Sequence, residues 1–312
     1  MGYDERTPPT AEEYAAYRTR FCNWGRWGPD DELGTLNHIT PGVRRAAADL
    51  VRDGRALSLS RPLDTRPGPS NPYPTHHFLA MPGSGGMLDY LGMFIHGFSQ
   101  THIDALCHLP TAEGLAWNGK PMAAGGIPGT HSGTIDFLAA GIVTRGVLYD
   151  IPRLRGTAFV EAGRPVHGWE LADAAAAQGV EARPGDAVII RSGFDPYWEA
   201  QGTPPAFGTA AGVHASAVEF LHRSDAALLV WDQQDAPMAD QGLPNPMGDI
   251  PVAMHVHAMV LPYLGMPIVD NAQLEPLAAA CASLGRWEFQ LVVAPLDLPG
   301  GTGSPVNPIA VL

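Results

Sequence analysis

The stretch DAVIIRSG, from Asp186 to Gly193, is a short apolar run bounded by turn-forming residues, and it predicts a buried β-strand. Similar runs precede it in GVLYDI, from Gly146 to Ile151, and follow it in AALLVWD, from Ala226 to Asp232. Helical patterns lie between them, at Trp169–Gln178 and Val213–Arg223. Strands and helices that alternate in this way predict a mixed α/β fold.

The two ends of the chain extend this pattern. Near the C-terminus, EPLAAACASLG predicts a helix and RWEFQLVVAPL a strand. Near the N-terminus, helices are expected at Thr10–Arg20 and Pro41–Asp53, the second because Pro starts it and Gly54 follows it. The stretch Arg66–Gly86 is too rich in Pro, Gly and Ser for a regular element, and it predicts either a loop that covers the substrate or an ordinary surface excursion.

Charge and cysteine usage exclude several classes of protein. The net charge is −13, from 32 acidic and 19 basic residues, so the chain would repel a phosphate backbone and we expect no nucleic-acid partner. The three cysteines, Cys22, Cys107 and Cys281, are too far apart for a CxxC zinc site and too few for a disulfide framework. Neither a signal peptide nor an apolar run of membrane-spanning length is present, so we expect a cytoplasmic protein without a membrane partner.

The segment HGFSQTHIDALCHLP, from His96 to Pro110, carries the residues that indicate chemistry. His102, Asp104 and His108 are separated by even numbers, so in an extended strand their side chains would project from one face. Imidazole and carboxylate two residues apart can chelate one divalent ion. A hydrogen-bonded HxD pair without a metal is the alternative, but ionisable groups are costly to bury unpaired.

Further residues of this site are expected from a segment far along the chain. In GDIPVAMHVHAMVLPYLG, Asp249 and Pro251 mark the start of a helix and Gly265 its end. His255 and His257 would lie about 200° apart on that helix, so at most one of them should face a given site. A short strand ending at Asp270 follows.

At this point the sequence resembles the cyclase family of metal hydrolases, which includes bacterial kynurenine formamidase and isatin hydrolase. THIDALCH is similar to the family's signature of His, Asp and His at these spacings, and NWGRWGPDDELGTLN, GDAVIIRSG and GTGSPVNPIA resemble stretches of its larger members. The resemblance implies an α/β fold with mixed sheets and a swivelling β/β/α-type core. It also implies one domain over residues 1–312, with an N-terminal extension at about residues 1–60.

The resemblance implies a set of metal ligands and a division of roles. The metal, Mn²⁺ or Zn²⁺, would be held by His102, Asp104, His108, His257 and Asp270, with His96, His108 and His257 as candidates for catalysis. Asp270 stands where the formamidase pattern has Glu, which puts a second metal ion in doubt. The family's short form has a His four residues before His102, where this chain has Phe98; we therefore prefer His96 as an acid/base or substrate contact.

A divalent ion at these residues would activate water for attack on a carbonyl. The resemblance implies that the protein is a metal-dependent hydrolase and that the carbonyl belongs to a cyclic amide, formamide or lactone. A metal-dependent cyclase or dehydratase, a non-catalytic metal-dependent ligand-binding protein and a thiol enzyme using Cys107 are the alternatives, and Cys107 would face away from the ligands in an extended strand.

The sequence gives weaker indications of the residues that contact the substrate. Trp24, Trp27, His77 and Phe98 are candidates, although core packing or surface exposure would explain each of them as well. The acids and amides of WDQQDAP, residues 231–237, either line the pocket or form a loop after a buried strand. The family's usual assemblies imply a homodimer or homotetramer with a small-molecule substrate.

Overall fold

The computed structural model describes residues 2–69, 71–83, 85–97, 99–122, 132–202, 211–246 and 254–312. Within these ranges, nine strands form one mixed sheet in the order β1-β11-β9-β5-β6-β7-β8-β4-β10, and β2 and β3 form a separate pair. The strands of the large sheet are β1 (Ala56–Ser58), β4 (His102–Asp104), β5 (Ile142–Asp150), β6 (Ala187–Arg191), β7 (Leu228–Trp231), β8 (Ile268–Asp270), β9 (Glu288–Val293), β10 (Gly303–Pro305) and β11 (Ile309–Val311). The expected α/β fold with a mixed sheet is confirmed.

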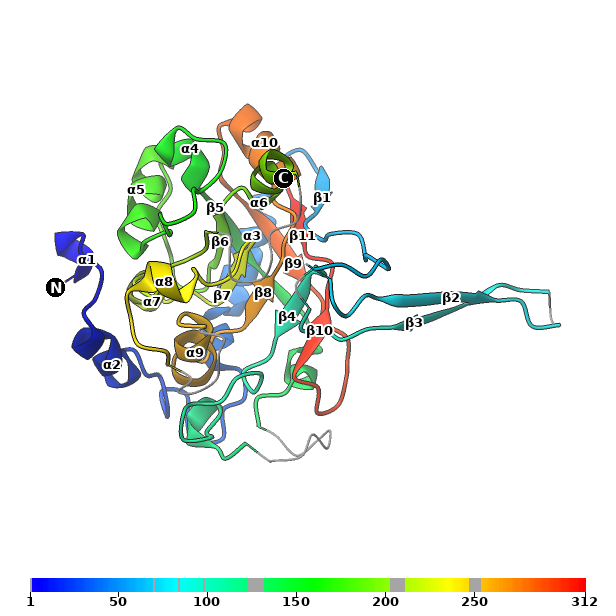
Figure 1. Cartoon of the computed structure of the whole chain (residues 1–312), viewed down its shortest axis with the longest axis horizontal. Coiled ribbons are helices and arrows are strands. Elements are labelled where there is room, and N and C mark those ends of the chain that lie inside the picture. The colour runs from blue at the N-terminus through cyan, green and yellow to red at the C-terminus, as the bar shows by residue number, and fades with distance from the viewer. Residues whose placement is uncertain are drawn as a thin grey trace.

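Helices cover both faces of this sheet (Figure 1). The α-helices are α1 (Gly2–Glu5), α2 (Ala11–Arg20), α3 (Pro41–Ala48), α4 (Ile151–Arg155), α5 (Gly168–Gln178), α6 (Phe194–Gln201), α7 (Ala217–Arg223), α8 (Met238–Gln241), α9 (His257–Met259) and α10 (Glu275–Leu284). The short turns are η1 (Gly34–His38), η2 (Trp117–Gly119), η3 (Ile135–Leu138) and the π-helix η4 (Val260–Leu264). Within the described ranges, no helix has both the length and the apolar composition needed to span a bilayer.

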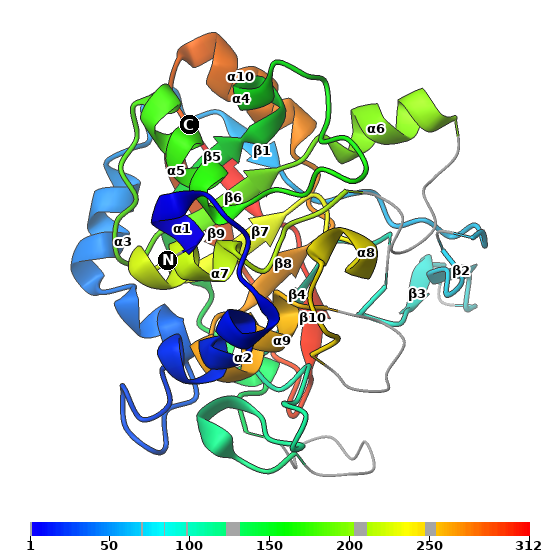
Figure 2. The same ribbon diagram turned by 60° about the vertical axis from the view of Figure 1, so that its left-hand side comes forward.

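The parallel strands β5, β6, β7 and β8 form the centre of the sheet and are buried on both faces. Successive side chains alternate between two apolar cores: Val147 and Tyr149 pack in one, and Leu148 between them packs in the other. Helices α2, α5, α7 and α9 contribute to the first core, and α10 contributes to the second. Figure 2 shows α2 and α9 next to each other beside β4 and β8.

Local sequence explains where the predicted helices begin and end. The hydroxyl of Thr10 accepts the N–H of Glu13 at the start of α2, and Gly179 ends α5 with a φ of 67°. Helix α3 ends at Ala48 rather than at the predicted Asp53, because the chain after it tightens into turns.

Two predicted elements differ from the observed ones. Strand β4 ends at Asp104, so the strand expected to run through His108 is wrong: the N–H of His108 donates to the carbonyl of Ala105 and closes a turn instead. The predicted start of the helix at Asp249 lies outside the described residues, and its last part is the π-helix η4, which ends at Gly265 as predicted. Pro262 within it has no N–H to donate, and the wider turn avoids its clash with the preceding α-helical turn.

The prediction for the stretch Arg66–Gly86 also needs correction. Part of it, His76–Ala80, is strand β2, which pairs with β3 (Leu88–Gly92) in an antiparallel hairpin. Figure 1 shows this hairpin running out from the body of the molecule. The alternating pattern that marks a strand was hidden because both faces of the hairpin are exposed and neither is consistently apolar.

Candidate metal centre

The register of β4 and β8 places three polar side chains on one face of the sheet. The two strands are antiparallel, with His102 opposite Asp270 and Asp104 opposite Ile268. Between the two polar residues of β4, Ile103 points into the core on the opposite face. His102, Asp104 and Asp270 are all at most 2% exposed, so the sheet holds two carboxylates and an imidazole out of water. A buried set of this kind requires partners or a cation.

Helix α9 adds His257 to this face. Its Nε2 atom lies 3.3 Å from Oδ2 of Asp270 and 3.5 Å from Oδ2 of Asp104. On the other side of the ring, Nδ1–H donates to the carboxylate of Asp235, which also accepts the N–H of Val256. Burial opposes the charged form, but Asp270 and Asp235 outweigh it and hold the pKa of His257 well above its usual value. A cation between the carboxylates would take the place of that proton.

His255, two residues before, lies in a different environment. Its Nε2–H donates to the carbonyl of Pro244 at 3.0 Å, and its own carbonyl accepts the hydroxyl of Tyr14 at 2.8 Å. The helix therefore brings His257, and not His255, to the two carboxylates.

His102 is fixed in one tautomer. Its Nδ1–H donates to the carbonyl of Gln100 at 3.0 Å, which leaves the lone pair of Nε2 directed into the cluster. That Nε2 lies 3.4 Å from Oδ1 of Asp104 and 3.8 Å from Oδ2 of Asp270. The Gln100 carbonyl is itself held by the side-chain amide of Asn271, so a neighbouring segment orients the ring.

Asp104 is the hub of the site. Burial opposes its charge, but His108 and the other imidazoles outweigh burial and keep the pKa of Asp104 well below its ordinary value, so it is ionised. Its Oδ2 is buried and has no hydrogen-bond partner among the described residues, although Nε2 of His257 lies 3.5 Å away and Nε2 of His108 3.9 Å away. An ionised oxygen left without a hydrogen bond amid imidazole nitrogens has the surroundings of a metal ligand.

His96 and His108 form the more accessible side of the site. Their rings stack with centroids 3.6 Å apart and planes 9° from parallel. Nδ1 of His96 lies 2.8 Å from Oδ1 of Asp104, and Nε2 lies 2.9 Å from the hydroxyl of Thr302, so both ring nitrogens have partners within the chain. Burial lowers the pKa of His108 to about 4, so this ring is neutral at pH 7. His96 and His108 have more exposed side chains than His102, Asp104, His257 and Asp270, at 25% and 18%.

We refer to His96, His102, Asp104, His108, His257 and Asp270 as the histidine–aspartate cluster. Two groups within it have ligand atoms that all lie within 4.8 Å of one another: His96, His102 and Asp104, and Asp104, His257 and Asp270. Mixed imidazole and carboxylate donors suit Zn²⁺ and Mn²⁺ alike. Together with the unpartnered oxygen of Asp104, this donor set fits a divalent ion.

Several residues around the cluster were not assigned by sequence reasoning. The indole N–H of Trp231 donates to Oδ1 of Asp270, and the amide of Gln234 donates to Oδ2 at 2.9 Å. With Asp235, these residues belong to WDQQDAP, where the position of acids and amides just after a buried strand was the available signal. Gly303 also matters, because a Cβ there would lie 2.6 Å from the ring of His96.

Three of the four predicted substrate contacts have partners elsewhere in the structure. The indole N–H of Trp24 donates to the carbonyl of Pro262 at 2.6 Å, Trp27 packs edge-on against His38, and His77 pairs with Asp89 on the exposed hairpin. Among the described residues, these three make no hydrogen bond or ring contact with the cluster, because packing and hairpin formation engage them elsewhere. Phe98 lies outside the described residues.

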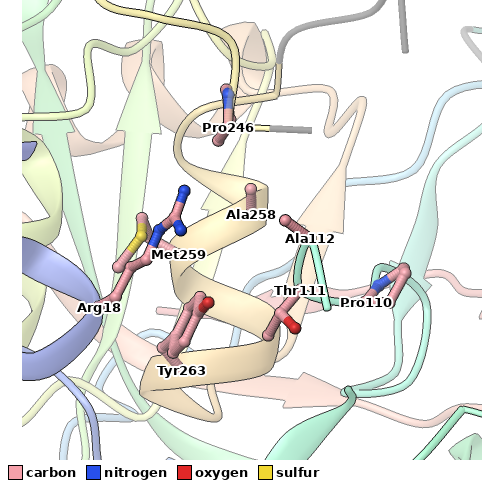
Figure 3. A pocket seen from close by; sticks show the side chains of 8 residues that line it. All are labelled: Arg18, Pro110, Thr111, Ala112, Pro246, Ala258, Met259 and Tyr263. Carbon is pink, nitrogen blue, oxygen red and sulfur yellow. The ribbon is translucent and has the colours of Figure 1, made fainter. Parts of the chain in front are cut away.

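A small pocket lies between α2, the segment after His108 and the helix that carries His257 (Figure 3). Arg18 and Tyr263 line one side and Thr111 the other. Its volume of about 10 Å³ is the room that one water molecule needs, so it is no substrate pocket as it stands.

Cys107 is fully buried in the apolar core that also contains Ile103. Burial raises the pKa of this thiol to about 12, so it carries no thiolate at neutral pH. Both findings oppose the thiol-enzyme alternative.

Comparisons with known proteins agree with the fold. The family model described as "Putative cyclase" matches residues 57–236. A crystal structure of a novel cyclase is 31% identical, with a TM-score of 0.79, and the match covers 95% of this chain and 99% of that one. An isatin hydrolase bound to the product analogue thioisatinate shares the fold at 16% identity and a TM-score of 0.57, over 85% of this chain and 94% of the other.

Isatin hydrolase A from Labrenzia aggregata, bound to benzyl benzoate, is similar at 17% identity and a TM-score of 0.57, over 88% of this chain and 98% of that one. The comparison with curated proteins finds no match. The family model covers more than half of the chain and the novel cyclase matches nearly all of it, so the chain belongs to the cyclase family.

Proposed function

We propose that this chain is a metal-dependent hydrolase that opens a cyclic amide with water, with formamides and lactones as related substrates. The observation that carries the proposal is the buried Oδ2 of Asp104, which has no hydrogen-bond partner among the described residues and faces the Nε2 atoms of His257 and His108. Membership of the cyclase family and the fold shared with isatin hydrolase support it.

His102, Asp104, His257 and Asp270 would hold the ion, with His108 at its accessible side. A divalent ion bound there supplies Lewis-acid chemistry, because it polarises a carbonyl and brings the pKa of water near 7. The chain's own contribution is orientation: Gln100 fixes the tautomer of His102 and Asp235 that of His257, so that each Nε2 lone pair points at the carboxylates.

His96 is the proposed acid and base. Its Nδ1–H donates to Asp104, and its Nε2 faces the hydroxyl of Thr302. The nitrogen that faces Asp104 therefore carries a proton, whereas a metal ligand would direct a lone pair toward the ion. It is also the most exposed ring of the cluster, so it can meet a substrate. Its neighbour His108 stays neutral, which limits repulsion when His96 takes up a proton.

The reaction adds one water molecule across the C–N bond. The oxygen of water joins the carbonyl carbon, His96 accepts one of its protons, and the same imidazole returns a proton to the leaving nitrogen. Ring opening then gives a carboxylic acid and an amine on one product molecule, and the acid releases its proton to the solvent.

The test is hydrolysis of a panel of lactams, aryl formamides and lactones by protein stripped with a chelator and then reloaded with Mn²⁺ or Zn²⁺. We expect activity to disappear with the metal and return on reloading, with metal content measured by mass spectrometry. Cys107→Ala serves as the control and should keep its activity, since its thiol is buried and protonated. Full activity after stripping would sink the proposal, and metal binding without turnover of any of the three substrate classes would favour a ligand-binding protein.

A further inference from the structure

Trp231, the last residue of β7, is fully buried and contacts two members of the histidine–aspartate cluster. Strand β7 lies parallel to β8, with Val230 opposite Val269, so Trp231 ends its strand beside Asp270. The indole N–H donates to Oδ1 of Asp270, and the indole ring lies 5.3 Å from that of His257. A buried indole N–H usually has a hydrogen-bond partner, but here the partner is a candidate metal ligand.

The two oxygens of Asp270 have different surroundings. Oδ1 accepts the indole N–H of Trp231, whereas Oδ2 lies 3.3 Å from Nε2 of His257 and 3.8 Å from Nε2 of His102. Oδ2 also accepts the side-chain N–H of Gln234 at 2.9 Å. Each carboxylate oxygen has two lone pairs, so Oδ2 retains one of them for an ion. With a donor on each oxygen, the carboxylate is held against rotation.

The indole N–H competes with the second bond that Asp270 could make to an ion. A carboxylate binds a divalent ion through one oxygen or through both. The indole N–H also withdraws electron density from the carboxylate, which makes the carboxylate a weaker ligand. This effect is opposite in sign to that of Asp235, whose negative charge makes His257 a stronger ligand.

The surroundings of Trp231 hold the indole in this place. Its ring belongs to the apolar core that also contains Leu229 of β7 and Met259 of α9. Its carbonyl accepts the N–H of Ala272, just after β8, at 2.9 Å. The indole therefore cannot leave Asp270 without opening the core, and we expect its hydrogen bond to persist when an ion enters the cluster.

We infer that Trp231 is a positioning residue that limits Asp270 to a single metal-binding oxygen, Oδ2. The inference rests on the proposed function, because it requires an ion at the cluster. If Oδ1 does not bind the ion, a coordination position remains open for water, as a catalytic site requires and a structural site lacks. Without the indole N–H, Oδ1 would be buried without its donor, and bonding to the ion would satisfy it.

The test compares Trp231→Phe with the wild type, with Co²⁺ as the metal probe. Phe keeps an aromatic ring in the core but removes the N–H, so Asp270 should bind the ion through both oxygens. The visible absorption of bound Co²⁺ should weaken, because it falls as the coordination number rises. The affinity for Co²⁺ should increase about tenfold, while kcat falls because the position for water is filled. A tryptophan that only fills the core would not raise the affinity when replaced.

Trp117→Phe is the matched control. Trp117 is also fully buried, and its indole N–H donates to the carbonyl of Asp31 at 3.0 Å, outside the cluster. The Co²⁺ spectrum and the Co²⁺ affinity of this variant should equal those of the wild type. An unchanged spectrum in Trp231→Phe, a lower affinity, or the same changes in Trp117→Phe would each overturn the inference.

A crystal structure of the wild type loaded with Zn²⁺ decides the question if circular dichroism shows that Trp231→Phe does not fold. One oxygen of Asp270 on the ion, with the indole N–H still on the other, would support the inference, and two oxygens on the ion would overturn it. Metal binding without hydrolysis would contradict the proposed function alone, whereas failure to bind Co²⁺ and Zn²⁺ would contradict both.

Discussion

The histidine–aspartate cluster at β4 and β8 and the pair His167–His214 beside α5 both bring buried and half-buried imidazoles together, but the partners of these imidazoles differ. In the cluster, imidazole Nε2 atoms face two carboxylates. In the pair, Nε2–H of His214 donates to the carbonyl of Gln241 at 3.0 Å, and Nδ1 accepts the N–H of Ser216 at 3.0 Å. Neutral groups satisfy both nitrogens, so no lone pair remains for an ion.

The pKa values reflect this difference. Carboxylates hold the pKa of His257 well above the ordinary value of histidine, whereas burial lowers that of His214 to about 4 and that of His167 to about 3. Grouped histidines alone therefore do not make a metal site. What distinguishes the cluster is a buried carboxylate with an unpartnered oxygen, and the following changes test that distinction.

The largest effect is expected from Asp104→Asn. Loss of the shared carboxylate should remove bound metal and lower kcat/KM by about 10³-fold or more, since the ion contributes several kcal/mol to catalysis. Metal content and hydrolysis rate are the measurements. Asp186→Asn, at an equally buried carboxylate outside the cluster, is the control and should keep its metal. Equal metal loss in both variants would show that Asp104 has no special role.

The next effect concerns the stability of the pair. The pKa of His214 is about 4 in the folded protein and about 6.5 in the unfolded chain. Its contribution to the free energy of unfolding is therefore present above pH 6.5 and is lost as the pH falls toward 4. Between pH 6.5 and pH 4, the unfolding free energy of the wild type should fall by about 3 kcal/mol more than that of His214→Gln. Urea denaturation of the metal-free proteins measures both values. Parallel pH curves for wild type and variant would contradict the assignment of His214 as a buried neutral ring.

A smaller effect is expected from Asp235→Asn. The amide can still contact His257 but no longer holds a protonated Nδ1 as an anion does, so metal affinity should fall about 10- to 100-fold. Competition with a chromogenic chelator measures this affinity. The control is Asp240→Asn, five residues on, whose carboxylate accepts the N–H of Gly163 away from the cluster. An unchanged affinity in Asp235→Asn would mean that His257 orients itself.

Much of this site was predictable from sequence, and the rest depended on tertiary packing. The two-residue period of a strand was enough to place His102 and Asp104 on one face. His108 is placed by a turn and not by the strand, since no local pattern marks the residue at which a strand stops pairing. Asp235 could not be assigned, because its contact with His257 joins segments that meet only through the packing of α9 on the sheet.

The hairpin of β2 and β3 illustrates the same limit. A tip rich in Gly and Pro connects its two strands. Because neither face is buried, the alternation of apolar and polar residues that reveals a strand is missing. Binary patterning predicts elements that pack on their own core. It fails where a segment's surface remains exposed in the single chain.

The smallest effect is expected from Thr302→Val. It tests whether His96 transfers a proton or is a packing residue like His214. Both ring nitrogens of His96 have partners, as in His214, yet one partner is Asp104 and the ring is a quarter exposed. If His96 moves a proton, losing the Thr302 hydroxyl at 2.9 Å should lower kcat by about tenfold, the worth of one hydrogen bond, with KM and metal content unchanged. A lowered melting temperature with kcat intact would make His96 a packing residue like His214. Thr302→Ser retains the hydroxyl and should restore kcat, which separates loss of the hydrogen bond from loss of side-chain volume.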